Sequence, residues 1–126
     1  MGYATELVDR YIAAWNTADD GERAAAVEKL FTADATMTDP LVEVVGRDGI
    51  RAVMAQAREM FPGHVFAPHG LVDGHHDLVR FGWALVPEAG GEPTVIGFDV
   101  AVLAAEDGQV RAVHGFLDKV PDPSAS

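Results

Sequence analysis

The hydrophobic periodicity of the chain changes at about His64, and this change limits the fold classes that it can adopt. Before His64 the apolar side chains recur at helical spacing, whereas after it they alternate with a period of two. Four strands are expected in the second half, separated by the turn clusters DGHHD, PEAGGEP and AEDG, at residues 65–72, 78–86, 94–104 and 110–120. Helices followed by a run of antiparallel strands indicate an α+β domain in which a curved sheet wraps over the helices. A cone-like cavity is one outcome of that arrangement.

The first half of the chain is predicted to hold three helices and two short strands. Apolar stripes place the helices at about residues 5–16, 21–31 and 47–60, and the strands at residues 34–39 and 42–45. Tyr11 and either Ala14 or Trp15 continue the apolar face of the first helix. Asp19 or Asp20 is a candidate N-cap of the second helix. The buried side of the third helix is expected to contain Ile50, Val53, Met54 and Ala57.

Asp39 is the first candidate for a functional acid. It ends a short alternating strand in which Ala35, Met37 and Asp39 share one face, so its carboxylate is expected among apolar neighbours. A carboxylate in such surroundings can act as a general base or acid near neutral pH. The alternative is that Asp39 and Pro40 simply open a turn, since Asp before Pro is a common turn signal.

The strands of the second half should present one aromatic face and one outer face. Phe81, Trp83 and Leu85 alternate with Arg80 and smaller residues, and the aromatic set is predicted to line the interior. In the last strand His114, Phe116 and Asp118 share one face, and this face is expected to point outward.

Composition excludes several classes of function. The 126 residues suit a single domain, residues 1–126. A net charge of −11 disfavours nucleic acid and anionic membranes as partners, and the absence of cysteine excludes a thiolate nucleophile and cysteine-bound zinc. The spacing of the five histidines matches no metal site, so neither a metal nor a cofactor is expected. The N-terminus has no signal pattern, so a soluble, cytoplasmic protein is the expectation.

Several segments together resemble a known superfamily. The helix RYIAAW, the phrase LFTADATMTDP, the helix start GRDGIRAV and the late strand and hairpin GFDVAVLAAEDGQV are similar to the nuclear transport factor 2-like superfamily, in its ketosteroid isomerase and SnoaL-like polyketide cyclase branch. The resemblance covers residues 5 to 120. It implies a cone-like, mostly antiparallel curved sheet around three N-terminal helices, the fold also called cystatin-like.

The resemblance also implies roles for individual residues. Asp39 matches the general base of ketosteroid isomerase, and Tyr11 matches the tyrosine of its oxyanion hole. Asp99 matches the second oxyanion donor if the following hairpin holds one extra residue; without that gap the position falls on Val100. Met54 stands where the isomerase has a further tyrosine. Trp15 replaces a smaller residue one turn after Tyr11 and should narrow the pocket or offer a surface for stacking.

The sequence thus predicts a cofactor-free domain that binds a small apolar molecule with a carbonyl group. Its chemistry would be proton transfer, as isomerisation or cyclisation, with Asp39, Tyr11 and Asp99 as catalytic residues. The substrate would contact Trp15, Met37, Met54, Phe81 and Trp83. The alternative is a non-catalytic ligand-binding or assembly domain of the same fold, because this fold hosts both. A homodimer formed through the outer sheet face is also expected.

Overall fold

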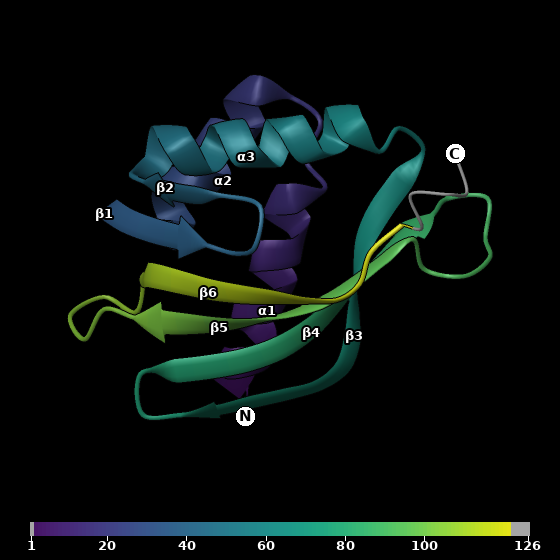
Figure 1. The fold of residues 1–126 in the computed structure, drawn as a ribbon. Coiled ribbons are helices and arrows are strands. Elements are labelled where there is room, and N and C mark those ends of the chain that lie inside the picture. Colours follow the sequence, from purple (N-terminus) through teal and green to yellow (C-terminus); the bar gives the residue numbers. More distant parts are fainter. Residues whose placement is uncertain (1, 122–126) are drawn as a thin grey trace.

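The computed structural model of the protein describes residues 2–121, which form three helices and six strands (Figure 1). The helices are α1 (Gly2–Trp15), α2 (Asp20–Leu30) and α3 (Arg47–Met60). The strands are β1 (Phe31–Thr38), β2 (Glu43–Val45), β3 (His64–His75), β4 (Leu78–Pro87), β5 (Val95–Leu103) and β6 (Val110–Lys119).

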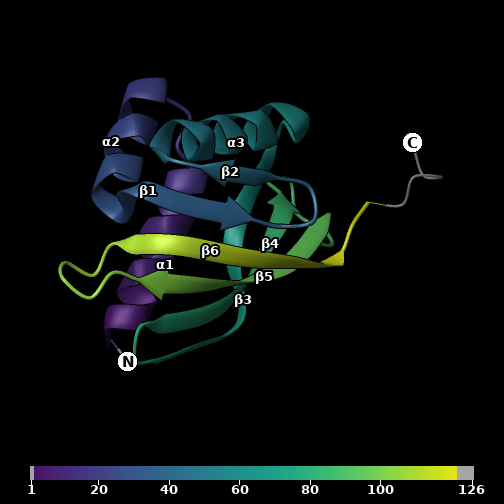
Figure 2. The same ribbon diagram turned by 60° about the vertical axis from the view of Figure 1, so that its left-hand side comes forward.

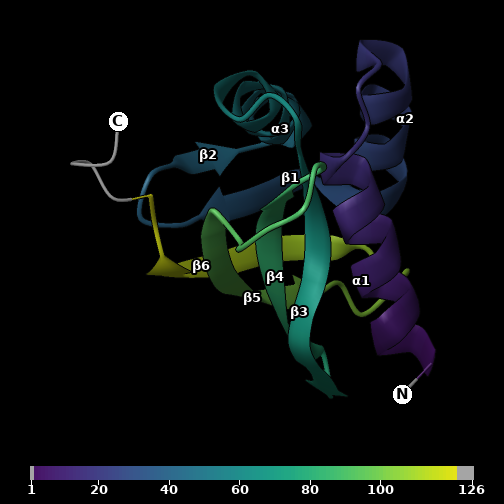
Figure 3. The ribbon, with the colours of Figure 1, turned by 90° about the vertical axis from the view of Figure 1, so that its right-hand side faces the viewer.

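The strands form one curved sheet in the order β2-β1-β6-β5-β4-β3. Neighbouring strands are antiparallel except β1 and β6, which run parallel and lie side by side in Figure 2. The helices lie on one side of the sheet, α1 against β3 and α3 against β1 and β2 (Figure 3). The sheet is not closed, since β2 and β3 are its two edges. The predicted α+β class with a curved, mostly antiparallel sheet is confirmed.

Local sequence explains where α2 and α3 begin. The Asp19 carboxylate accepts a hydrogen bond from the Glu22 backbone N–H over 2.9 Å, so Asp19 rather than Asp20 is the N-cap of α2. The helix α3 follows Gly46, whose φ of 91° is readily adopted by glycine and rarely by other residues.

Two strands have one end that lies three residues from its predicted position. Phe31, expected at the end of the second helix, begins β1 instead, because its carbonyl accepts two hydrogen bonds from the Arg47 guanidinium and its ring is fully buried. β3 runs on to His75, past the expected end at residue 72. A register shift between Pro68 and Val72 lets the ladder with β4 resume, so only the last part of the DGHHD cluster forms the turn.

The core lies between the helices and the concave side of the sheet. Its largest fully buried side chains come from all three helices and from β1, β4 and β6, and they are Phe31, Phe81, Ile50, Met54, Val8, Val27, Val79, Val110 and Val113. No helix within residues 2–121 has the length and apolar character that crossing a membrane requires.

Candidate functional site

A cavity of about 680 Å³ opens between the helices and the concave face of the sheet. Most of its lining is apolar and comes from α1, α3 and the strands β1, β3, β4, β5 and β6. No lysine, arginine or histidine belongs to this lining within the described part of the chain. The lining side chains are Tyr11, Ile12, Trp15, Met37, Thr38, Asp39, Leu41, Val42, Val53, Gln56, Ala57, Met60, Phe61, Phe66, Trp83, Leu85, Val95, Asp99, Val113, Gly115, Leu117, Val120 and Pro121.

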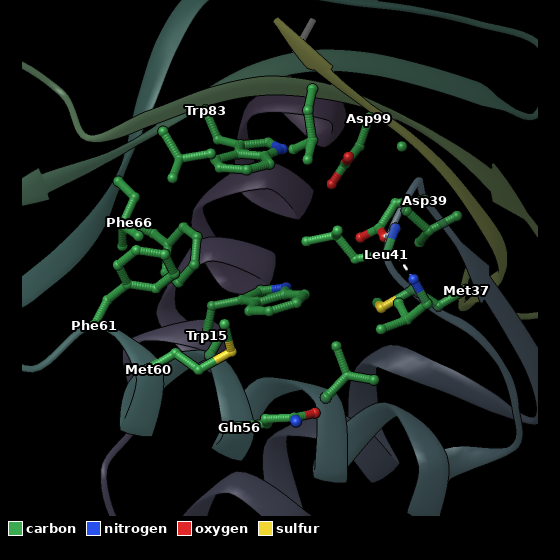
Figure 4. Close-up of a pocket in the computed structure, with 18 of the residues that line it drawn as sticks. Trp15, Met37, Asp39, Leu41, Gln56, Met60, Phe61, Phe66, Trp83 and Asp99 are labelled. Carbon is green, nitrogen blue, oxygen red and sulfur yellow. Dashed lines mark hydrogen bonds between the residues drawn. The ribbon is translucent and has the colours of Figure 1, made fainter. Parts of the chain in front are cut away.

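Aromatic rings from three elements form one wall of this cavity (Figure 4). Phe66 of β3 contacts both indoles, with ring centroids 5.2 Å from Trp15 and 5.5 Å from Trp83. Phe66 is fixed by Asn16, whose amide donates to the Phe66 carbonyl over 2.9 Å and accepts from the Phe66 N–H over 2.8 Å. Asn16 thereby joins the end of α1 to β3. The sequence predicts only that Asn16 ends the first helix.

Tyr11 and Asp99 form the polar end of the cavity. The Tyr11 hydroxyl donates a hydrogen bond to Asp99 Oδ2 over 2.9 Å, and both side chains are buried. Burial raises the pKa of Asp99 from its ordinary 3.8 to about 6, and the charge of Asp39 adds to this rise. The hydrogen bond from Tyr11 and, to a lesser degree, the nearby Trp83 N–H lower the pKa of Asp99. Burial, and then the Asp99 charge, hold the pKa of Tyr11 well above 10.0, so its hydroxyl keeps its proton.

Asp39 both lines the cavity and opens a turn. It follows the last residue of β1, and its Oδ1 accepts hydrogen bonds from the backbone N–H groups of Leu41 over 2.7 Å and Val42 over 3.0 Å. Among residues 2–121, nothing donates a hydrogen bond to Oδ2 of Asp39. One carboxylate oxygen therefore positions the turn, and the other remains available in the cavity.

Gly115 on β6 allows the two acids to approach each other. It lies opposite Asp99 in the β5–β6 ladder. A Cβ atom at residue 115 would lie 2.7 Å from Asp99 Oδ1, closer than side chains tolerate, and 3.2 Å from Asp39 Cβ, which is a tight contact. Sequence reasoning missed Gly115, although a glycine inside a strand often marks a close approach of other groups.

The structure places three of the five expected substrate-binding residues in the cavity lining: Trp15, Met37 and Trp83. Met54 and Phe81 differ from that expectation, because both are fully buried core residues outside the lining. On α3 it is Val53 and Ala57, one turn apart, that face the cavity. The ring of Phe81 packs edge-on against the ring of Tyr11, with centroids 5.0 Å apart. Trp83, two residues further along β4, lines the cavity.

The cavity mouth is apolar and partly open to solvent. Leu41, Met60 and Val120 line it and expose 76%, 61% and 55% of their surfaces. On the opposite face of the sheet, Phe98 stacks on Phe116 with centroids 5.1 Å apart. Within the described residues, no group of three or more potential metal ligands comes together.

Comparisons with known proteins agree with this architecture. The SnoaL-like domain family matches residues 8–113. A candidate isomerase of the SnoaL-like family from Agrobacterium tumefaciens strain C58 is 36% identical, with a TM-score of 0.87 over 94% of this chain and 99% of that one.

Two more distant structures share the fold. A candidate SnoaL-like polyketide cyclase from Jannaschia sp. CCS1 is 24% identical, with a TM-score of 0.70 over 91% of this chain and 85% of that one. A protein of unknown function with a cystatin-like fold, from Nostoc punctiforme, is 14% identical, with a TM-score of 0.65 over 95% of this chain and 89% of that one. A search of curated proteins found no match.

Proposed function

The chain belongs to the SnoaL-like family, and from that premise we propose that its cavity catalyses proton transfer at a carbon beside a carbonyl group. The substrate would be a small, largely apolar molecule, and the reaction an isomerisation or a cyclisation. No cofactor is required for such a step. The observation that carries the proposal is the convergence of Tyr11, Asp39 and Asp99 at one end of a largely apolar cavity.

In the proposed step, Asp39 is the general base. Its free Oδ2 takes a proton from the carbon next to the carbonyl, the C–H electron pair forms a carbon–carbon double bond, and the carbonyl π electrons move onto oxygen. Tyr11 and protonated Asp99 donate hydrogen bonds to this enolate oxygen. Asp39 then returns the proton to another carbon of the enolate system. In the ring-closing alternative the enolate carbon attacks an internal carbonyl carbon, the π electrons of that carbonyl move onto its oxygen, and the resulting alkoxide takes the proton from Asp39. Donors of this kind are worth about 3 to 4 kcal/mol each in the transition state.

The surroundings of the three residues support these roles. The largely apolar lining lowers the local dielectric and so strengthens electrostatic interactions with a developing enolate charge. The pKa of Asp99, raised to about 6 mainly by burial, brings its protonated form within reach near neutral pH. Tyr11 retains its proton over the whole physiological range.

Hydrogen–deuterium exchange tests the proposal without knowledge of the natural substrate. Cyclic ketones of one to three rings are incubated with the protein in D₂O, and deuterium at the carbon beside the carbonyl is followed by mass spectrometry. We expect exchange above the rate in buffer for at least one ketone that also quenches tryptophan emission. Binding without any exchange across the panel would contradict catalysis and favour a ligand-binding domain. A cytoplasmic location and a homodimer remain predictions from the sequence.

A further inference from the structure

The cavity holds two tryptophans whose indole N–H groups have different surroundings. The indole N–H of Trp83 is turned toward the Asp99 carboxylate (Figure 4). The buried N–H of Trp15 has no hydrogen-bond partner of ordinary geometry among the described residues, and its ring lies beside Tyr11 instead, with centroids 6.2 Å apart. The two indoles line the same cavity, so they form a natural pair for comparison.

The backbone explains how Trp83 reaches Asp99. In the β4–β5 ladder Trp83 lies opposite Gly97, while Asp99 lies opposite Phe81. Trp83 and Asp99 are therefore diagonal neighbours on one face of the sheet, a separation that a large side chain can span.

Gly97 provides the space in which the indole lies. A Cβ atom at residue 97 would be 2.6 Å from Trp83 Cζ2 and 2.9 Å from Cε2. Because Cε2 is bonded to Nε1, the edge of the indole that carries the N–H rests directly on the Gly97 backbone. From there the N–H is directed along β5 toward Asp99, two residues further on. A side chain at residue 97 would lift the ring from this position.

We propose that Trp83 is a positioning residue whose indole N–H, seated against Gly97, donates a hydrogen bond to the Asp99 carboxylate and orients it. A donor at this position favours the ionised carboxylate. Tyr11 and Trp83 then hold the carboxylate from two sides, while Gly115 leaves room behind it. Among the described residues, the titratable groups that face Asp99 are Tyr11 from α1 and Asp39, which directly follows β1. The effect on catalysis rests on the proposed function, but the arrangement itself does not.

The test in the unchanged protein is NMR of the indole N–H groups. The sequence contains two tryptophans, so two indole resonances are expected, and Trp15→Phe and Trp83→Phe assign them. The Trp83 resonance should move with a midpoint near pH 6, the value at which Asp99 titrates, and the Trp15 resonance should move far less. A Trp83 resonance that stays constant while Asp99 titrates would overturn the proposal. This measurement requires no substrate, so it is independent of whether the protein is an enzyme.

The matched variants give the second readout. The Asp99 midpoint is followed through the carboxyl ¹³C resonance, which Asp99→Asn assigns. Trp83→Phe keeps an aromatic ring and removes the N–H, so the Asp99 midpoint should rise by about one pH unit or more, a tenfold gain in proton affinity. Trp15→Phe should leave it close to the wild-type value. Equal midpoints in the two variants would show that Trp83 has no specific influence on Asp99.

Discussion

The Tyr11 hydroxyl donates its hydrogen bond to Asp99 Oδ2 over 2.9 Å, and this contact joins the first helix to the fifth strand across 88 positions of sequence. Strand β5 lies between β4 and β6, inside the sheet. The polar end of the cavity is therefore part of the tertiary packing, and its geometry exists only when the domain is folded. Every variant of these residues requires a stability measurement beside its functional assay.

Asp39→Asn should abolish proton transfer and leave the domain folded. The amide cannot accept the carbon proton, and removal of a general base typically lowers the rate by about 10² to 10⁴. The amide oxygen can still accept the hydrogen bonds from Leu41 and Val42, so the turn should persist. The deuterium exchange rate of an active ketone measures the loss, and circular dichroism checks the fold. Exchange at the wild-type rate would exclude Asp39 as the base.

Asp99 should make stability depend on pH. Its pKa is raised from 3.8 to about 6 in the folded protein, mainly by burial, so the folded state binds this proton more tightly than the unfolded state. The resulting stabilisation is fully present below pH 3.8 and is lost as the pH rises through about 6. Two pKa units correspond to about 3 kcal/mol.

Asp99→Asn removes this titration. Relative to wild type, the free energy of unfolding of the variant should therefore increase by about 2 to 3 kcal/mol between pH 4 and pH 7. Urea denaturation of both proteins at several pH values measures the difference. A difference that stays constant over this range would mean that Asp99 titrates alike in the folded and unfolded states.

Gly115→Ala should disrupt the polar end of the cavity. The added methyl group would lie 2.7 Å from Asp99 Oδ1, so the carboxylate must move away and its bond to Tyr11 should weaken. We expect loss of most ketone exchange activity with the sheet still formed. Gly2→Ala, whose methyl group meets nothing within 4 Å, is the matched control. Full activity in Gly115→Ala would show that the position of the Asp99 carboxylate against residue 115 is unimportant for the reaction.

The outer sheet face should mediate a homodimer. Phe116 is 53% exposed and stacks on Phe98, so an apolar surface is left facing solvent. Sedimentation at micromolar concentration should give twice the 13.4 kDa of one chain, and Phe116→Asp should shift the protein to the monomer. A monomeric wild-type protein would rule out this prediction.

The fold was largely predictable from the sequence, because periodicity and turn residues are local signals. The start of β1 at Phe31 was not, since it depends on hydrogen bonds from Arg47, 16 residues further along the chain. The parallel pairing of β1 with β6 likewise depends on tertiary structure.

Within the site, Asp39 was indicated by the alternation of its strand, Tyr11 and Asp99 were indicated by resemblance, and the structure brings all three to one end of the cavity. Met54 and Val53 are neighbours on α3, and spacing alone does not show which of them faces the core and which the cavity. Gly97 and Gly115 have no side chain, so a search for catalytic or binding groups in the sequence does not find them. Their importance becomes visible only when the strands beside them are in register.

The exposed apolar mouth formed by Leu41, Met60 and Val120 has a practical consequence for the purified protein. A hydrophobic cavity with such an entrance readily extracts fatty acids, detergents or plasticisers from a cell lysate or buffer. A bound contaminant of this kind would compete with added ketones and would mask both their binding and their deuterium exchange. Native mass spectrometry before and after extraction with organic solvent should therefore precede every ligand screen.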